Sequence, residues 1–473
     1  MAYDFCISSH AGAIAKQRFT FFGGGKPKKD LMYTDDTICK TALAARTQGS
    51  LAAWLASAWS RPVFRAEVIL TYYKPFTCAR LVAEVRLEPR QWTTPESKLI
   101  VYIHVYPTRD DARKEYALFA SARSLTSEGL TKVTFLEDIQ SVVWILPDGP
   151  AFDSIDFCFR YEEFSHFISE QVPLGHNVVA ELPRLIRYVP RKRAIFRYEA
   201  NVGSHKSTFY IKSYPPDHDI QAARNLEILT ELANQRRLAF QPPLFVHHSR
   251  RWHAVVMDEV PGMPLSDLID TASPFLFANV GSSLASLHMS NIGATGTWPP
   301  ERLLNALAEA ISDTQRALPV LTDSLNTFRQ QILERRRTLL FDEKTPIHGN
   351  LFGDQILIDS DQVGIVDWDD LGLGDPLFDL GRLIAHFIYV SRHQKNAPTR
   401  IIQNVNTMLE AYRTQTRQAI VWDRLRWHIA VALVMRAKIS SLRKLSITLV
   451  SDVITSLAEA QRVLHGTSAW IPQ

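Results

Sequence analysis

Two stretches in the C-terminal part of the chain decide the fold: "IHGNLFGDQILI" at 347–358 and "GIVDWDDLGLGDPLFDL" at 364–380. The first has a His-Gly pair, an apolar residue and a short polar turn that leads into an apolar strand. The second begins as an apolar strand that ends at Asp367. A carboxylate at the end of a strand is well placed to face a cleft, so Asp367 is the first candidate for a functional residue.

Length and composition limit what can surround these stretches. At roughly 100–200 residues per domain, 473 residues predict two to four domains or lobes. A hydrophobic content of 46% and a charged content of 22% are typical of a globular protein. The net charge of +4 is small and the Lys and Arg residues are scattered, which argues against a nucleic-acid partner.

No signal in the sequence predicts export or a membrane partner. The start of the chain lacks the basic and apolar segments of a secretory leader, and every apolar run is far shorter than the ~20 residues of a membrane-spanning helix. None of the cysteines is in a CxxC pair, so we expect free thiols in a reducing compartment: Cys6, Cys39, Cys78 and Cys158. These observations predict a cytoplasmic protein.

The N-terminal segment, 1–57, contains the glycine-rich and basic stretch "FFGGGKPKKD" at 21–30. A phosphate-binding loop would need a strand before it and a helix that starts at Lys-Ser/Thr after it, and neither is present. The stretch is therefore interpreted as a flexible loop.

Residues 58–180 and 181–262 carry the same pattern in the same order. Tyr73 and Pro75 match Tyr188 and Pro190, and "YIHVYP" matches "YIKSYP". Each copy predicts three strands, a helix and two further strands, because the apolar spacing changes from strand-like to helical after the Tyr-Pro pair. We expect the first copy to be an extra α+β module that resembles a duplicated small lobe, and that packs beside the second copy or binds a protein partner.

From 263 to 473 the pattern is mostly helical, so the expected fold class is α+β. The preceding stretch, "VVMDEVPGMPLSDLI" at 255–269, runs from an apolar strand into a Pro-Gly turn. Such a connector can offer backbone groups to an adenine ring while it links two lobes, although a simple turn would look the same. The connector residues are Asp258, Glu259 and Val260.

Several polar residues match the needs of phosphoryl transfer from a nucleotide, which requires a cation on the phosphates, metal ligands and a group that positions the acceptor. Lys212 lies in a predicted strand, where a fixed ammonium could reach the phosphates, and Glu227 in the next helix could pair with it. Asp367 is a candidate ligand for Mg²⁺, because hard cations bind oxygen. Asp375 and Asp379 are expected to cap and brace the helix that follows.

The stretch from about 185 to 460 resembles the aminoglycoside phosphotransferase and choline kinase-like family, a branch of the protein-kinase fold. That family's loop reads His-Gly-Asp-Leu, three variable residues and then Asn. Its metal strand reads Ile-Asp-Trp-Glu/Asp, followed by Gly-Asp-Pro and Asp-Leu. Here "VDWDD", "LGDP", "FDL", "LASLH" and the "VPG" hinge are intact. The resemblance implies a bilobal protein-kinase-like fold that binds ATP and Mg²⁺ between a β-rich lobe and a helical lobe.

Carried over residue by residue, the resemblance makes Lys212 the phosphate-binding lysine and Glu227 its partner. The hinge would be 258–260 and Asp367 the main Mg²⁺ ligand. The catalytic Asp position holds Asn350 and the second metal-ligand position holds Gln355. The chain also departs from the family pattern in its glycine-rich loop, since "ANVGSHKS" at 200–207 offers a single glycine.

Asn350 leaves two hypotheses. An amide cannot act as a general base, a loss that typically costs ~10²–10⁴ in rate, but it could orient an acceptor hydroxyl through its carbonyl oxygen. Asp354 could supply the missing carboxylate if the turn were rearranged. The chain is thus either a weak or atypical kinase for a small-molecule hydroxyl, or a nucleotide-binding pseudokinase or scaffold. Available carboxylates for a cationic acceptor are Asp369, Asp370 and Glu410.

Overall fold

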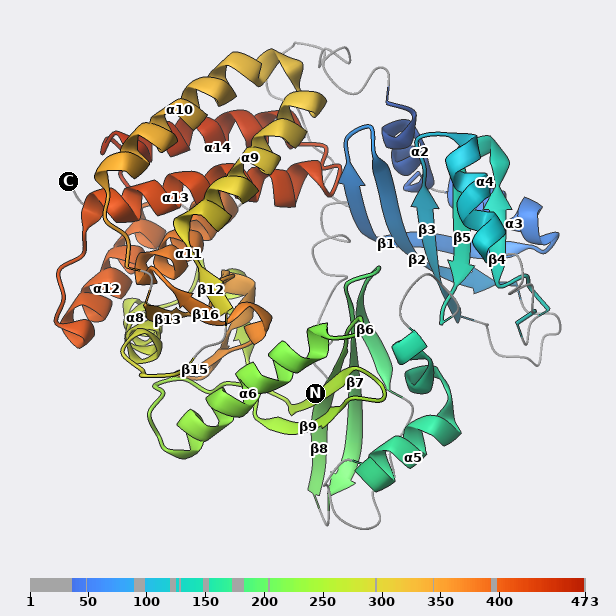
Figure 1. Cartoon of the computed structure of the whole chain (residues 1–473), viewed down its shortest axis with the longest axis horizontal. Helices are drawn as coiled ribbons and strands as arrows, with labels where there is room; N and C mark the ends of the chain where they lie inside the picture. The colour runs from blue at the N-terminus through green and yellow to red at the C-terminus, as the bar shows by residue number, and fades with distance from the viewer. Residues whose placement is uncertain are drawn as a thin grey trace.

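The computed structural model describes residues 36–47, 49–88, 98–119, 125–126, 129–147, 153–171, 183–202, 205–293, 296–342, 344–392 and 398–471. The glycine-rich stretch at 21–30, Cys6 and the single glycine of "ANVGSHKS" lie outside these residues. Three units make up the mixed α+β fold: a first sheet with its helices, a second sheet, and a helical lobe (Figure 1).

The first sheet is antiparallel and has the strand order β1-β2-β3-β5-β4. Helices α2 (Thr37–Ala45) and α3 (Ser50–Trp59) precede it, and α4 (Arg109–Leu118) connects its third and fourth strands. Its strands are β1 (Val63–Lys74), β2 (Cys78–Leu87), β3 (Lys98–Val105), β4 (Val133–Leu136) and β5 (Ser141–Ile145).

The second sheet has the corresponding order, β6-β7-β8-β10-β9, and α6 (His218–Asn234) connects its third and fourth strands. The two registers also correspond. His104 lies opposite Arg80 in the first sheet, and Lys212 lies opposite Ile195 in the second. Each unit thus has the order of elements that the sequence predicts. The strands are β6 (Arg184–Val189), β7 (Arg193–Val202), β8 (His205–Ser213), β9 (Phe245–Ser249) and β10 (Ala254–Asp258).

The helical lobe contains seven long helices and one short helix among the described residues, and two small three-stranded sheets. Its helices are α7 (Leu265–Leu268), α8 (Pro274–His288), α9 (Pro300–Ala317), α10 (Thr322–Thr338), α11 (Pro376–Ser391), α12 (Pro398–Thr416), α13 (Trp422–Ala437) and α14 (Leu449–Leu464). Its strands are β11 (Met263–Pro264), β12 (Gly296–Trp298), β13 (Thr345–Ile347), β14 (Ile356–Asp359), β15 (Gln362–Ile365) and β16 (Gly372–Gly374).

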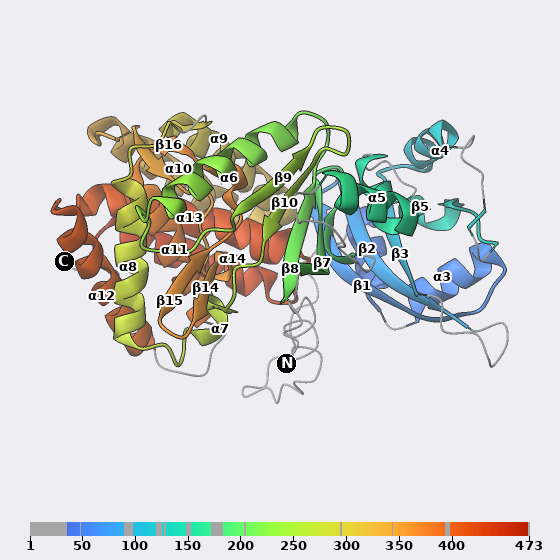
Figure 2. The ribbon, with the colours of Figure 1, turned by 90° about the horizontal axis from the view of Figure 1, so that it is seen from below.

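The first sheet contacts both other units, one through each face. On one face, β1, β2 and β3 share a buried apolar cluster with α2, α3 and the part of the helical lobe that includes Leu442, Leu449 and Val453. On the other face, Val82, Tyr102 and Trp144 belong to a cluster with the second sheet and with α5 (Tyr161–Gln171). The first sheet is therefore anchored to both lobes, and Figure 2 shows it next to the second sheet.

Two further observations bear on the expected environment of the chain. No helix among the described residues combines the length and the apolar character that crossing a membrane requires. The three cysteines in the described part of the chain, Cys39, Cys78 and Cys158, are free and buried.

The contact between the first sheet and the helical lobe can be tested at Leu449, which is fully buried in the shared cluster. We expect Leu449→Ala to lower the free energy of unfolding by about 2–5 kcal/mol, because it removes apolar contacts and leaves a cavity. Ile447→Ala is the matched control, because Ile447 is 89% exposed and such changes shift stability by about 0.5 kcal/mol or less. Urea unfolding measures both; equal effects would contradict the proposed anchoring.

Candidate functional site

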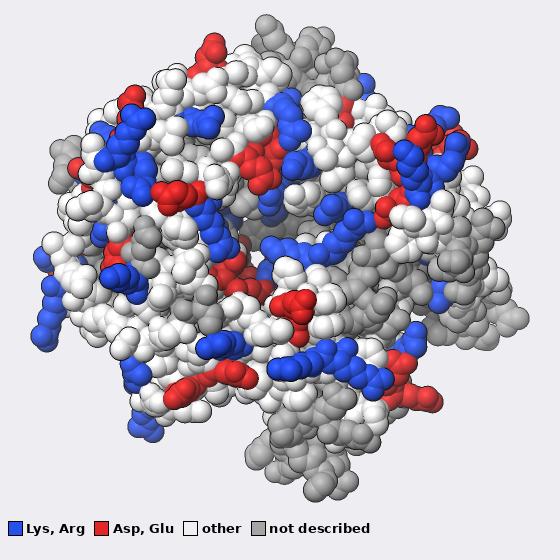
Figure 3. All heavy atoms as spheres, in the orientation of Figure 1, with Lys and Arg blue, Asp and Glu red and all other residues white. Residues whose placement is uncertain are grey.

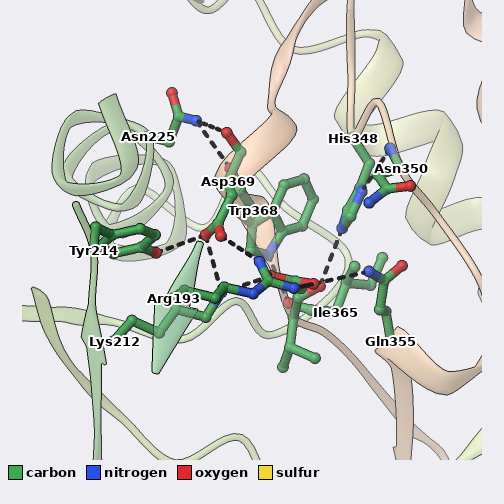
Figure 4. Close-up of polar contacts among 12 residues, drawn as sticks. Arg193, Lys212, Tyr214, Asn225, His348, Asn350, Gln355, Ile365, Trp368 and Asp369 are labelled. Carbon is green, nitrogen blue, oxygen red and sulfur yellow. Dashed lines mark hydrogen bonds and ion pairs between the residues drawn. The ribbon is translucent and has the colours of Figure 1, made fainter. Parts of the chain in front are cut away.

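Asp367 lies two residues after the end of β15, next to the β14–β15 hairpin of the helical lobe. Both of its carboxylate oxygens accept hydrogen bonds, and Figure 4 labels the residues that donate them. Oδ1 accepts from Lys212 Nζ at 2.6 Å and from Arg193 Nη1 at 3.0 Å. Oδ2 accepts from Arg193 Nη2 at 3.1 Å and from Gln355 Nε2 at 3.2 Å. Lys212 and Asp367, which the sequence singles out separately as functional residues, are thus in direct contact between the second sheet and the helical lobe.

Asp369 completes a cluster of four charges. Its carboxylate accepts from Lys212 Nζ at 2.9 Å, Arg193 Nη1 at 2.5 Å and the Tyr214 hydroxyl at 2.8 Å. Burial alone would raise the pKa of Asp367, but Lys212 and Arg193 hold it well below its usual value. The same cations lower the pKa of Asp369. Both carboxylates are therefore charged at neutral pH, and two cations balance two anions.

The predicted pairing of Glu227 with Lys212 is wrong. Glu227 is exposed on α6, and Lys212 pairs with Asp367 and Asp369 instead. The residue that α6 turns toward the cluster is Asn225, which is fully buried and donates to the Trp368 carbonyl at 2.9 Å. Helical periodicity explains the error, because two positions along a helix turn a side chain about 200° away.

The His-Gly loop is held from beneath by Asp379. This fully buried carboxylate accepts from the backbone N–H groups of His348 at 2.6 Å and Gly349 at 3.0 Å, and it contacts His288 Nε2 at 3.3 Å. Asp379 therefore braces the loop itself. Gly349 has a φ of +79°, and a Cβ there would lie 2.4 Å from the Asp370 carbonyl oxygen, so the loop requires glycine. Asp375 caps α11 as predicted, since its side chain accepts from the N–H of Leu377.

Asn350 does not present its carbonyl oxygen to the cleft as expected. That oxygen accepts a hydrogen bond from Arg382 Nη2 at 2.6 Å. The orientation of the amide is determined, because arginine has only donors and can be met only by the oxygen. The amide nitrogen, which is a donor, is the part of Asn350 left to act on a ligand.

Gln355 also differs from its predicted role as a metal ligand. Its Oε1 accepts from the backbone N–H of Phe352 at 2.8 Å, and its Nε2 donates to Asp367. The amide oxygen that would bind a cation is therefore turned toward the backbone.

The site as arranged does not fit Mg²⁺. Hard divalent cations need several oxygen ligands with open coordination, whereas both oxygens of Asp367 are occupied by donors from Arg193, Lys212 and Gln355. Among the residues the structure describes, no group of three or more His, Cys, Asp or Glu side chains is arranged to hold a metal ion.

The three predicted hinge residues lie where the second sheet ends and the helical lobe begins. Asp258 ends β10, and its carboxylate accepts from the N–H of Leu244; burial raises its pKa to about 6. Glu259 donates its backbone N–H to the Thr208 carbonyl at 3.2 Å, and Val260 is buried. These residues connect the second sheet to β11 of the helical lobe, as predicted for the hinge.

Three residues that the sequence did not single out shape the site: Arg193, Tyr214 and Arg382. Arg193 begins β7, and its own pKa is raised by Asp367 and Asp369 despite its burial. Tyr214 is the Tyr of the second "YIKSYP" copy, one residue past β8. The repeated Tyr-Pro pair was a usable signal for Tyr214, but a charge at the start of a strand is too common to point to Arg193.

Comparison with known proteins identifies one family. The model of the phosphotransferase enzyme family, known as APH, matches residues 191–428. The viomycin phosphotransferase of Streptomyces vinaceus is 30% identical over 145 residues, which are 28% of this chain and 50% of that protein. The chain therefore spans about half the length of the curated relative it matches.

Solved structures with a similar fold include a choline/ethanolamine kinase family protein from Mesorhizobium loti and a choline kinase from Cryptosporidium parvum. The first has a TM-score of 0.41 and 15% identity, and the match covers 58% of this chain and 87% of that one. The second has a TM-score of 0.44 and 10% identity, and the match covers 67% of this chain and 96% of that one.

The bracing role of Asp379 leads to a pH-dependent prediction. Burial would raise the pKa of Asp379, but hydrogen bonds from His288 and the His348 backbone hold it below its ordinary 3.8. A lowered carboxylate pKa adds stability that is present above 3.8 and lost as the pH falls through the folded-state value. We expect Asp379→Asn to destabilise the protein by about 3 kcal/mol at pH 7, because buried N–H donors lose a charged acceptor.

The difference between wild type and Asp379→Asn should then stay the same from pH 7 down to about 4 and shrink as the pH falls below 3.8. Urea unfolding at several pH values measures it. Asp323→Asn, in the first turn of α10 and on the surface, is the control. A difference that stays constant with pH would show that the carboxylate charge is not what braces the loop.

Proposed function

Because the chain belongs to the phosphotransferase enzyme family, we propose that it transfers the γ-phosphoryl group of ATP to a hydroxyl group of a small molecule. The second sheet and the helical lobe form the bilobal, protein-kinase-like fold of that family. Nucleotide would bind between the lobes, below the 258–260 connector. The observation that carries the proposal is the contact of Lys212 with Asp367, which puts the phosphate-binding cation and the strand-end carboxylate in one place.

In the proposed step, a bond forms between the acceptor oxygen and the γ-phosphorus. The bond from that phosphorus to the β–γ bridging oxygen breaks, and ADP leaves. The transition state is loose, so positioning and charge stabilisation supply most of the catalysis. The hydroxyl proton passes to an oxygen of the transferred group and then to water, so that no general base is required. Lys212 and Arg193 would bind the phosphates, and the Asn350 amide nitrogen would donate to the reacting oxygens.

Nucleotide has to compete with the protein's own carboxylates. Lys212 and Arg193 are each bound to both Asp367 and Asp369. A triphosphate carries more charge than these carboxylates and offers more acceptor oxygens, so it can displace Asp369 from the two cations. Arg193 would keep its two hydrogen bonds to Asp367 while its remaining donors turn to the phosphates. Slow or weak ATP binding is the expected consequence.

Removal of Lys212 tests the nucleotide site. We expect ATP to raise the melting temperature of the wild type and to have no effect on Lys212→Ala, because the ammonium is the phosphate ligand with the least exposure, at 9%. Lys206→Ala, on the same strand but 63% exposed, should behave as wild type. Calorimetric titration gives the affinities. Unchanged ATP binding in Lys212→Ala would overturn the proposed site.

A second candidate function is a nucleotide-binding pseudokinase or scaffold that does not transfer phosphate. Specific observations favour it: Asn350 and Gln355 replace the expected Asp and Asn, and the Asp367 oxygens are occupied. The two candidates differ in turnover. ADP formation that depends on an added acceptor and disappears in Asp367→Ala would support the enzyme, whereas no turnover with any acceptor would support the scaffold.

The role of Arg193 in excluding the metal can be tested directly. Because the arginine occupies both Asp367 oxygens, we expect ATP affinity of the wild type to be nearly the same with Mg²⁺ and with EDTA. Arg193→Met keeps the apolar stem but frees the carboxylate, so ATP binding should become at least about tenfold tighter with Mg²⁺, or about 1.4 kcal/mol. Arg197→Met, on the same strand and paired with Glu199, is the control. Strong Mg²⁺ dependence in the wild type would contradict the assignment.

A further inference from the structure

Two arginines enclose the loop that carries Asn350. Arg382 on α11 and Arg436 on α13 each place their guanidinium carbon 4.6 Å from the centre of the Phe352 ring. Helices α11 and α13 pack along each other, so their side chains reach the same point from adjacent helices. The ring thus fixes two positive charges beside the residue at the catalytic position.

Neither cation forms a direct ion pair among the described residues; the carboxylates whose charges act on them are Asp370 and Asp379 for Arg382 and Asp354 for Arg436. Arg382 is only 6% exposed, and its partner is the neutral Asn350 amide. Arg436 forms no ion pair with any residue that the structure describes. The Nε atoms of both are buried without a hydrogen-bond partner. Burial lowers the pKa of Arg382 to about 10 and also lowers that of Arg436. A buried charge without a direct ion pair is costly to the free protein unless an anion binds there.

Two further cations are Lys444, which lies beyond the C-terminal end of α13, and Arg187 in β6. Partial burial lowers the pKa of Lys444, and the charges of Arg436 and Arg187 lower it further. The carboxylate among them is Asp354, which accepts a hydrogen bond from Ser266 at 2.5 Å and lies 3.9 Å from His386 Nε2. Figure 3 shows Lys and Arg side chains, together with some Asp and Glu side chains, around the hollow in the middle of this face.

The first sheet and its helices hold Lys444 in place. Arg46, which follows α2, donates to the backbone carbonyls of Lys444 at 2.8 Å and Leu445 at 3.0 Å. The backbone N–H of Tyr73 in β1 donates to the Arg443 carbonyl at 2.9 Å. The extra N-terminal unit therefore fixes the backbone of a segment that carries a cation toward the site.

The carboxylates expected to bind a cationic acceptor are not available. Asp369 is bound to Lys212 and Arg193. Glu410 is exposed and pairs with Arg413 at 2.7 Å, on an open groove between α8 and α12. Asp370 forms an ion pair with Arg302 at 3.8 Å, and its charge also acts on Arg382. The charged side chains closest to the Asn350 loop that make no ion pair among the described residues are therefore Arg382 and Arg436.

We propose that the acceptor of this protein is an anion, a phosphorylated sugar or polyol whose phosphate group is bound by Arg382, Arg436 and Lys444. The guanidinium fork matches phosphate oxygens, and lysine adds a mobile point charge. With its phosphate held there, the acceptor places a hydroxyl next to Asn350. The role of the bound anion as acceptor rests on the proposed phosphotransfer. The anion site itself can be tested without turnover.

The test is calorimetric titration of the full chain with inorganic phosphate, glucose 6-phosphate, glucose and choline at constant ionic strength, without nucleotide. We expect glucose 6-phosphate and phosphate to bind, and glucose and choline not to bind. Lys444→Gln and Arg436→Gln should each weaken glucose 6-phosphate binding by about tenfold or more, since a charged hydrogen bond is lost. Arg337→Gln, which removes an exposed charge of α10, should bind as wild type.

Three outcomes overturn the proposal: no binding of either anion, equal affinity in wild type and both variants, or tighter binding of choline than of the anions. Lys444 is exposed, so Lys444→Gln keeps the test valid should Arg436→Gln fail to fold. Lys212→Ala separates this proposal from the proposed function. It should lose ATP binding and keep anion binding, whereas anion binding that disappears with Lys212 would assign the anion to the nucleotide site.

Discussion

The contact on which the rest of the structure depends is the cluster of Arg193, Lys212, Asp367 and Asp369. It joins a sheet to a helical lobe through charges, in a place where apolar contacts would leave no room for a ligand. A buried ion pair gains little net stability, because desolvation offsets most of the attraction, but removal of one partner is costly. The cluster therefore fixes the distance and orientation of the two lobes more than it stabilises them. An anionic ligand that binds there must replace a carboxylate as the partner of Arg193 or Lys212.

The first sheet supports this arrangement from outside the site. It packs against the helical lobe through one face and against the second sheet through the other. It shares strand order and register with the second sheet, yet the register position of Lys212 is occupied by His104. Burial and two nearby arginines lower the pKa of His104 to about 3, so it is neutral, and its ring lies 4.0 Å from that of Tyr106. The register position that carries the charge of Lys212 in one sheet is thus a packing position in the other.

The fold was largely predictable from the sequence, because strand patterns, the repeated Tyr-Pro pairs and the "VDWDD" stretch are local signals. Lys212 and Asp367 were each singled out from the sequence as functional residues, but their direct contact was not predicted, because Glu227 was the expected partner of Lys212. Glu227 was assigned wrongly because the expected spacing does not fit the face that α6 turns inward, where Asn225 lies. The orientation of the Gln355 and Asn350 amides could not be predicted, since it depends on partners, Phe352 and Arg382, that tertiary packing supplies.

The amide at position 350 and the arginines around it are best understood together. A carboxylate at 350 would form an ion pair with Arg382, whose Nη2 already lies 2.6 Å from the Asn350 oxygen. That pair would cancel the positive charge next to the acceptor and would leave Arg436 as the main remaining cation at Phe352. Asn350 makes the same hydrogen bond without cancelling the charge. In the proposed phosphotransfer, an amide that cannot act as a general base would thus keep the charge of Arg382 uncancelled, where a phosphorylated acceptor and the γ-phosphoryl group would otherwise repel each other.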